Sequence, residues 1–248
     1  MTLLGCETGR VKVALVTGAG RRLGRELALG LGQAGYRVAV HYRSDRTAAE
    51  ETLALLSAGG AEGAAIRADL AAPGAAARLV EEVLERFGSL DVLVHSASPW
   101  VEKPPDEVSE ADWDTTFAVA PKAAFFLVQA ARPALERSQG AVLLVSDVAA
   151  QKAWPLHLPH AVAKAAIDAL VRNLAVALGP AVRVNGIAPG IVLPPPGMLP
   201  GEVDRLVART PLRRLVSVAD VVSAALHLVG NRSITGQVLA VDAGRSVV

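Results

Sequence analysis

A short glycine-rich turn near the start of the sequence most limits what this chain can fold into. Residues 13–24 read V-A-L-V-T-G-A-G-R-R-L-G, an apolar run followed by glycines and then by an amphipathic segment. In that segment Leu27, Leu31 and Ala34 recur at helical spacing. The pattern predicts a strand, a tight turn and a helix whose first N–H groups suit a pyrophosphate. A tight turn without a ligand is the alternative interpretation.

Apolar runs alternate with amphipathic segments along the whole chain. The runs predicted as strands are 11–16, 37–41, 63–66, 90–94, 141–145, 182–187 and 238–241. The patterns of helix length include 47–58, 75–87, 111–135 and 160–178. Because the strand runs are continuous rather than alternating, both faces of their sheet should be covered by helices. The sequence therefore predicts one α/β domain over residues 1–248, a Rossmann-type doubly wound parallel sheet with helices on both faces.

Composition limits the partners of this chain. Hydrophobic residues make up 52% and charged residues 20% of the 248 positions, as in soluble globular proteins. No apolar run reaches the length of a membrane span, and residues 1–10 lack a signal-peptide core, so we expect a cytoplasmic protein. The single cysteine, Cys6, excludes a disulfide framework. The net charge of +1 gives no basic excess for nucleic acid.

The glycine turn resembles a known family. It reads T-G-x-x-x-R-x-G, with Gly18 and Gly24 as outer glycines and Arg22 between them. This motif resembles the nucleotide loop of the short-chain dehydrogenases/reductases. The arginine resembles the pteridine reductase branch, in which it reaches over the cofactor phosphate towards the pterin. The resemblance runs from about residue 11 to residue 244 and implies a nicotinamide cofactor, a small-molecule substrate and a homotetramer.

The residues after the second predicted strand bear on the choice of cofactor. His41, Tyr42, Arg43 and Ser44 stand where NAD enzymes commonly place an acid for the ribose 2′-hydroxyl. Arg43 can instead make charge-assisted contacts with a 2′-phosphate, and Ser44 can add a hydrogen bond. The sequence therefore favours NADPH/NADP+ over NADH. An ordinary polar loop is the alternative.

The resemblance implies further cofactor contacts along the chain. They are Gly18, Arg22, Leu23, Gly24, Asp69, Leu70, Ser96, Ala97, Lys164, Pro189, Gly190, Ile191 and Val192. Asp69-Leu70 would contact the adenine, unless Asp69 is a plain helix cap. The turn at 189–190 would follow the nicotinamide carboxamide. Segment 191–202 is expected to be a loop that closes over the substrate.

Four residues are predicted to contact the substrate: Arg22, Ser98, Trp100 and Asp147. Trp100 stands where pteridine reductases place an aromatic residue that stacks on the pterin. The alternative is that Trp100 packs a loop onto the body of the protein. Relatives have two asparagines before Ala97, and here they are His95 and Ser96.

The predicted catalytic residues are Asp147, His160 and Lys164. Asp147 matches the aspartate of the pteridine reductases. His160 replaces the tyrosine of the family and lies one helical turn before Lys164, so both share a helix face. The relay asparagine is replaced by Ala120. His157 precedes His160 by one turn, but no third ligand is evident and no metal is predicted.

Three functions remain open. The first is NADPH-dependent reduction of a pterin-like or related cyclic substrate, with the proton from Asp147 or His160. The second is a protein that binds NADP(H) and senses or scaffolds without turnover, because the tyrosine and the relay asparagine are missing. The third is a general carbonyl reductase, for instance on 3-oxoacyl or sugar substrates.

Overall fold

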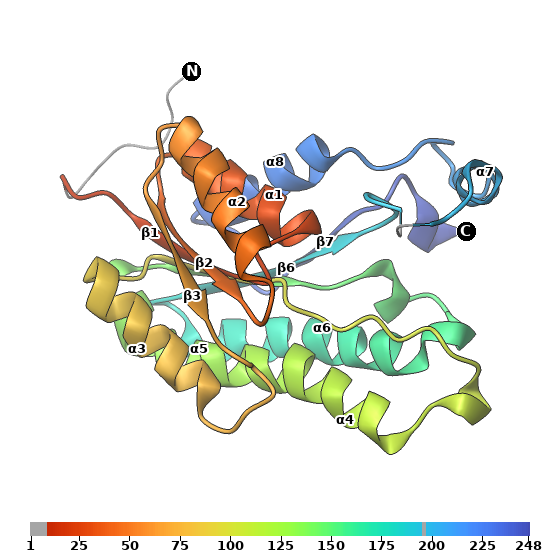
Figure 1. Cartoon of the computed structure of the whole chain (residues 1–248), viewed down its shortest axis with the longest axis horizontal. Helices are drawn as coiled ribbons and strands as arrows, with labels where there is room; N and C mark the ends of the chain where they lie inside the picture. The colour runs from red at the N-terminus through yellow and green to blue at the C-terminus, as the bar shows by residue number, and fades with distance from the viewer. Residues whose placement is uncertain (1–8, 195–196) are drawn as a thin grey trace.

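The computed structural model describes residues 9–194 and 197–248, and its centre is a sheet of seven parallel strands in the order β3-β2-β1-β4-β5-β6-β7 (Figure 1). Cys6 and residues 195–196 of the expected substrate loop lie outside the described residues. The strands are β1 (Val13–Thr17), β2 (Arg37–Tyr42), β3 (Gly63–Arg67), β4 (Val92–His95), β5 (Ala141–Val145), β6 (Arg183–Pro189) and β7 (Val238–Val241).

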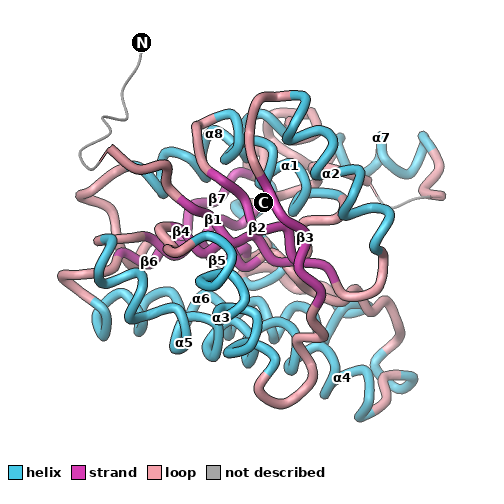
Figure 2. The backbone as a smooth tube through the Cα atoms, turned by 60° about the vertical axis from the view of Figure 1, so that its left-hand side comes forward, coloured by secondary structure: helices cyan, strands magenta, loops and turns pink. Residues whose placement is uncertain are grey.

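Helices cover both faces of this sheet, as Figure 2 shows. One face carries α1 (Arg22–Gln33), α2 (Arg46–Ala58) and α8 (Val218–Gly230). The other carries α3 (Ala75–Phe87), α5 (Ala123–Ser138) and α6 (Leu158–Leu178), with α4 (Glu110–Phe117) packed on α6. The remaining α-helix, α7 (Pro200–Ala208), lies near the C-terminus. The predicted doubly wound α/β fold is confirmed.

Two apolar cores explain why the strand runs are continuous. Side chains from one face of β1 and β4, such as Leu15 and Leu93, pack with α3, α5 and α6. Their neighbours in the strands, such as Val16 and Val94, pack with α1, α2 and α8. Both faces of the central strands are therefore dry, as unbroken apolar runs require. No helix in the described part of the chain is long and apolar enough to cross a membrane.

The structure differs from the sequence prediction at the long helix expected over residues 111–135. The helix begins at Glu110, capped by Ser109, and is interrupted by a π-helical segment at 118–122 that contains Pro121. Proline has no N–H and cannot complete the normal α-helical ladder, so a local π turn accommodates it. Two α-helices, α4 and α5, therefore replace the single one.

The strand order places the expected ligand site. The chain fills the sheet from β1 towards β3 and then crosses back to place β4 on the other side of β1. Thr17, at the end of β1, lies in register with His95, at the end of β4. Doubly wound sheets bind ligands outside the carboxyl ends of the strands at such a reversal point.

Candidate active site

The glycine turn is shaped by two close approaches of the backbone. A Cβ atom added to Gly24 would lie 2.2 Å from the carbonyl oxygen of Gly18, and one added to Gly18 would lie 3.0 Å from the Cα of Ala97. Gly18 also has a φ of +66°, which side-chain-bearing residues rarely adopt. Both positions therefore need glycine, and the turn carries the N-terminus of α1 against the ends of β1 and β4. This cradle fits a pyrophosphate.

Arg22 joins the glycine turn to the expected substrate loop. It is the first residue of α1 and has a left-handed φ of +51°. Its Nη2 donates a hydrogen bond to the carbonyl oxygen of Leu193, which follows β6. The Arg22 side chain therefore connects the glycine turn to Leu193, in the segment that follows β6.

His41 supports the turn from behind. Its buried ring accepts a hydrogen bond from the Gly18 N–H at Nδ1 (3.1 Å) and contacts the carbonyl oxygen of Ala68 through Nε2 (3.0 Å). These partners fix the neutral tautomer with its proton on Nε2. Burial disfavours the charged imidazolium and lowers the pKa of His41 to about 4. Both nitrogens are occupied, so the His41 side chain holds the turn and offers no group to a cofactor.

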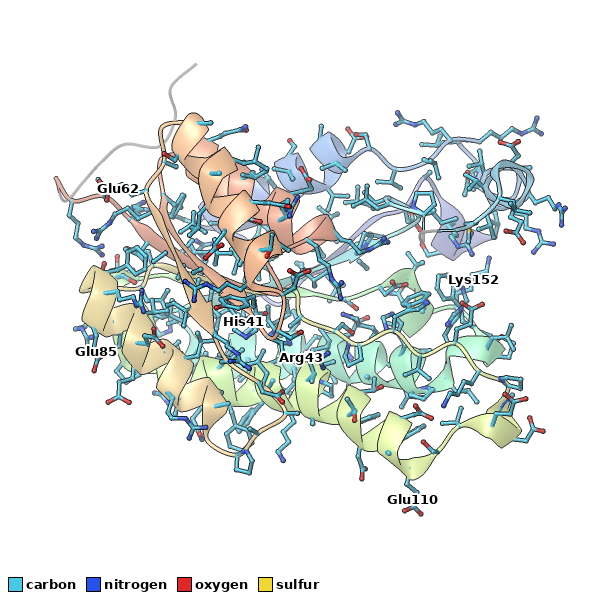
Figure 3. All side chains as sticks on the ribbon, viewed as in Figure 1. His41, Arg43, Glu62, Glu85, Glu110 and Lys152 are labelled. Atoms are coloured by element: carbon cyan, nitrogen blue, oxygen red, sulfur yellow. The ribbon has the colours of Figure 1, made fainter. Side chains whose placement is uncertain are left out.

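Arg43 lies just beyond the end of β2, close to His41 (Figure 3). Its side chain is exposed, and its carbonyl oxygen accepts a hydrogen bond from Nε of Arg67 at 3.1 Å. Ser44 is exposed beside it, ahead of the α2 cap at Asp45. The two side chains predicted to meet a 2′-phosphate are therefore both open to a ligand.

Other predicted cofactor contacts are partly occupied by the protein itself. Asp69 accepts a hydrogen bond from the Ala71 N–H at 3.1 Å, as a local cap would, and the buried Leu70 side chain packs into the core. The half-buried Leu23 and Tyr42 pack on the core of the other face. Any ligand contact from Leu70 would therefore be through its backbone.

His95 organises the end of β4. The Thr17 hydroxyl accepts hydrogen bonds from the N–H groups of Ser96 (3.0 Å) and Ala97 (3.2 Å), so it donates its own proton to Nδ1 of His95 (2.9 Å). Nε2 of His95 then donates to the carbonyl oxygen of Val119 at 3.1 Å. Burial is the largest cause that lowers the pKa of His95 to about 3. A neutral imidazole thus connects β1, β4 and the π-helical segment.

Asp147 and His160 face each other at the end of β5. Oδ1 of Asp147 accepts a hydrogen bond from the Ala149 N–H (2.8 Å), and Oδ2 lies 3.5 Å from Nε2 of His160. The His160 side chain is 5% exposed and that of Asp147 is 18% exposed. Among the described residues, neither ring nitrogen of His160 has a hydrogen-bond partner. Buried polar atoms are rarely left unpaired, so this imidazole is available for a ligand or for the carboxyl group beside it.

Lys164 follows His160 by one turn of α6. Its buried ammonium group donates a hydrogen bond to the carbonyl oxygen of Val145 at 2.6 Å. Burial lowers the pKa of Lys164 to about 8, while the charges of Asp147 and Asp168 act in the opposite direction. Two of its three N–H donors remain for the ribose that the resemblance implies.

A cluster of aromatic rings lies beside the pair of Asp147 and His160. It consists of Trp100, Trp154, His157 and His160. Trp100 is 49% exposed, and its ring centroid lies 4.9 Å from that of His160 and 4.5 Å from that of His157. Trp100 is therefore not buried in the body of the protein. The nearby Ser98 is half-buried, and its hydroxyl lies 3.3 Å from the carbonyl oxygen of Pro99.

The turn after β6 is pinned against β7. The Gly190 N–H donates to the carbonyl oxygen of Val241 at 3.0 Å, and a Cβ atom added to Gly190 would lie 2.8 Å from the Cα of Asp242. The carbonyl oxygen of Ile191 accepts a hydrogen bond from Val216. Pro189 ends β6, and Ile191 and Val192 are half-buried. The expected loop 191–202 is shorter than predicted, because α7 begins at Pro200.

Sequence reasoning passed over three residues that the structure brings to the site. Asp168 is buried on α6 and accepts a hydrogen bond from the Ser146 hydroxyl. Its spacing of one turn from Lys164 was a signal that could have found it. Trp154 and Arg245 contact each other from distant parts of the chain, and nothing local in the sequence reveals this. Within residues 9–194 and 197–248, no three His, Cys, Asp or Glu residues are grouped to hold a metal ion.

Known proteins resemble this chain over most of its length. A family model described as enoyl-(acyl carrier protein) reductase matches residues 18–246. The hydroxynaphthalene reductase-like protein Arp2 of Metarhizium guizhouense is 36% identical, and the alignment covers 94% of each chain.

Two solved structures are also similar over nearly the whole chain. FolM alternative dihydrofolate reductase 1 from Brucella canis, complexed with NADP, is 32% identical with a TM-score of 0.89, over 96% of this chain and 94% of that one. The angucycline C-6 ketoreductase LanV with bound NADP is 29% identical with a TM-score of 0.89, over 96% of each. The chain therefore belongs to the short-chain dehydrogenase/reductase family.

Proposed function

We propose that this protein is an NADPH-dependent reductase of a flat, pterin-like or related fused-ring substrate, which it reduces at a C=O or C=N bond. One observation carries the proposal. The half-exposed Trp100 ring lies 4.9 Å from His160, whose Nε2 lies 3.5 Å from Asp147. A flat ring stacked on this indole would bring its reacting bond next to the two groups able to supply a proton.

The cofactor is NADP(H). The two solved relatives hold NADP, and the glycine turn of this chain offers the same kind of cradle at a helix N-terminus. Arg43 and Ser44 are exposed where a 2′-phosphate would lie, and Lys164 has donors left for the nicotinamide ribose. NADPH supplies the hydride when bound, and this chain supplies position and a proton.

The proton comes from the pair of Asp147 and His160. Hydride addition to the carbon of a C=O or C=N bond leaves the electron pair on the heteroatom, which must take up one proton. Asp147 is the more exposed member, so we assign it the delivery of the proton. His160 has a supporting role, in which it holds a proton that can pass to Asp147. The 3.5 Å separation allows one proton to pass between them after a small movement.

The names of the relatives support a flat substrate. Hydroxynaphthalene, dihydrofolate and angucycline compounds all contain fused rings, and a tryptophan at the mouth of the site suits such rings. A general carbonyl reductase, including one of the 3-oxoacyl type, is compatible with the same geometry. The alternative of a protein that binds NADP(H) without turnover is favoured by His160 and Ala120, which replace two groups of the usual proton relay.

The test is NADPH oxidation by the purified protein with a panel of compounds. The panel contains a dihydropterin, a quinonoid dihydropterin, a fused-ring ketone such as 1-tetralone, a 3-oxoacyl thioester and a simple acyclic ketone. Preference for the fused-ring compounds, lost in Trp100→Ala but kept in a variant of an exposed apolar residue on α2, Leu55→Ala, is the expected result. Preference for the thioester would favour the general reductase. Tight NADPH binding with no turnover on any compound would favour the binding protein.

We also propose that the protein is a homotetramer. Several large apolar side chains on α4, α5 and α6 are exposed in the single chain, namely Trp113, Phe125, Phe126, Leu158, Val162 and Val176. Exposed apolar side chains on helices that pack side by side are commonly covered by another subunit.

A further inference from the structure

The end of the chain turns back towards the aromatic cluster. Asp242 fixes this turn, because its two carboxylate oxygens accept hydrogen bonds from the N–H groups of Gly244 (2.9 Å) and Ser246 (2.6 Å). Lys152 ties the turn to the segment that follows β5, since its ammonium group donates to the carbonyl oxygen of Arg245 at 3.2 Å. Figure 3 shows Lys152 at the end of the molecule where the C-terminus lies.

This turn lays the Arg245 side chain on the aromatic cluster. The Arg245 Cζ lies 5.1 Å from the centroid of the Trp154 ring. Trp154 meets Trp100 edge to face, with centroids 6.2 Å apart, and Trp100 contacts His160. A flat ligand held against Trp100, with its reacting bond at His160, would therefore extend its far edge towards Arg245.

The charge of Arg245 is not balanced by an ion pair. Its Nε is buried without a hydrogen-bond partner, and no carboxylate among the described residues lies within ion-pair distance of the guanidinium. Both oxygens of Asp242 are occupied by backbone N–H groups. Burial is the largest influence on the pKa of Arg245 and lowers it; Asp147 and Asp242 act in the opposite direction, and Arg209 acts in the same direction as burial. An arriving anion would offset this loss of hydration.

We propose that Arg245 binds a carboxylate on the substrate, at the edge of the fused ring opposite the bond that is reduced. This inference rests on the proposed function, because it uses the same site. A guanidinium group matches a carboxylate with two parallel hydrogen bonds, and a site beside an aromatic wall strengthens them. Arg245 thus selects the substrate, and the pair of Asp147 and His160 acts on it.

The test compares an acid with its neutral ester, using compounds that cannot be reduced. Naphthalene-2-carboxylate and methyl naphthalene-2-carboxylate are titrated into the NADP+ complex, and binding is followed by tryptophan fluorescence. We expect the acid to bind about tenfold more tightly than the ester in the wild type, which is the size of one charge-assisted contact. Arg245→Gln should remove this preference and leave affinity for the ester unchanged.

Two further variants keep the result interpretable. Arg205→Gln removes an exposed cation from α7 and should keep the preference. Arg245→Lys keeps the positive charge but loses the two parallel N–H donors of the guanidinium group, so it should retain only part of the preference for the acid. This variant also serves as the test if Arg245→Gln fails to fold. Equal affinity for acid and ester in the wild type, or an intact preference in Arg245→Gln, would overturn the proposal.

Kinetics separate this inference from the proposed function. A tetralone carboxylate and its methyl ester are compared in the NADPH-oxidation assay. Reduction of both with no lower KM for the acid leaves the reductase standing and removes the role of Arg245. Selective binding of the naphthalene acid without turnover of either ketone supports Arg245 as an anion site and counts against the reductase.

Discussion

Nε2 of His160 lies 3.5 Å from Oδ2 of Asp147, and both ring nitrogens of this buried histidine lack a hydrogen-bond partner in the part of the chain that the structure describes. The resemblance described from the sequence implies a tyrosine at the position of His160, so this pair is the expected departure from the family pattern. An unpaired buried imidazole costs stability. That cost is understandable at a site where the imidazole exchanges a proton with a carboxyl group.

Substitution of the pair tests which member delivers the proton. Asp147→Asn should lower the rate of NADPH oxidation by about 100-fold or more, the usual effect of losing a positioned acid. His160→Gln should cost less, because Asp147 remains and its side chain is partly exposed. His160→Tyr should keep or raise activity on simple ketones, since it restores the residue of the family. A full rate in Asp147→Asn together with an inactive His160→Gln would reverse the two roles.

Cofactor preference tests the residues after β2. NADPH should bind at least about tenfold more tightly than NADH, because one charge-assisted contact from Arg43 to a 2′-phosphate contributes about 1.5–3 kcal/mol. Fluorescence titration of both cofactors measures this preference. Arg43→Ala should remove most of it.

Arg46→Ala is the matched control. Arg46 is exposed three positions further on and is paired with Glu50 at 2.7 Å, so its loss should leave the preference unchanged. The assignment fails if NADH binds as well as NADPH, or if Arg43→Ala binds both as the wild type does.

The arrangement of strands and helices could be predicted because burial on both faces of the sheet accounts for the apolar runs of the central strands. Val16 and Leu15 point to opposite faces of β1, and both faces are buried, so the run is unbroken. The π-helical segment at 118–122 could not be read in the same way. Proline is normally a sign that a helix ends, and here a π turn that contains Pro121 joins α4 to α5.

The site could be predicted only in part, because sequence shows which residues come together along the chain but not which way each side chain points. His41 stands in a motif that suggests cofactor contact, yet its ring turns inward to Gly18 and to Ala68, which is distant in sequence. Arg245 and Trp154 meet only because the last turn of the chain folds back. Contacts of this kind follow from the tertiary fold and leave no local signal.

Stability in acid tests the two buried histidines. Their folded-state pKa values are about 4 for His41 and about 3 for His95, below the ordinary value of 6.5. Below pH 6.5 the unfolded chain therefore binds protons that the folded chain does not. The free energy of unfolding consequently decreases as the pH is lowered. Each histidine should contribute a loss of about 1.4 kcal/mol per pH unit between pH 6.5 and its folded pKa.

His95→Asn isolates one of these contributions. An asparagine can accept from Thr17 and donate to the Val119 carbonyl, as the imidazole does, but it does not titrate. Urea unfolding at pH 7 and pH 5 should show a loss about 2 kcal/mol smaller in this variant than in the wild type. His227→Gln, at an exposed position on α8, should lose as much as the wild type. Identical losses in His95→Asn and wild type would contradict the neutral, buried assignment of His95.

Assembly is tested at the exposed aromatic residues of α4 and α5. Phe125 and Phe126 are 39% and 44% exposed and contact each other edge to face, while Trp113 stacks on Phe117. We expect light scattering to give the mass of a tetramer at micromolar concentration. Phe126→Glu should shift the mass to a smaller species, because a charge cannot be buried in an apolar interface without a partner.

The control for this substitution is Leu55→Glu. Leu55 is similarly exposed, at 49%, but lies on α2, on the other side of the sheet from α5. If α4 and α5 form the interface, the mass should fall only in Phe126→Glu, while circular dichroism shows the same helix content in both variants. A wild-type protein that scatters as a monomer would contradict the tetramer itself. A wild-type tetramer that Phe126→Glu leaves intact would instead move the interface away from this surface.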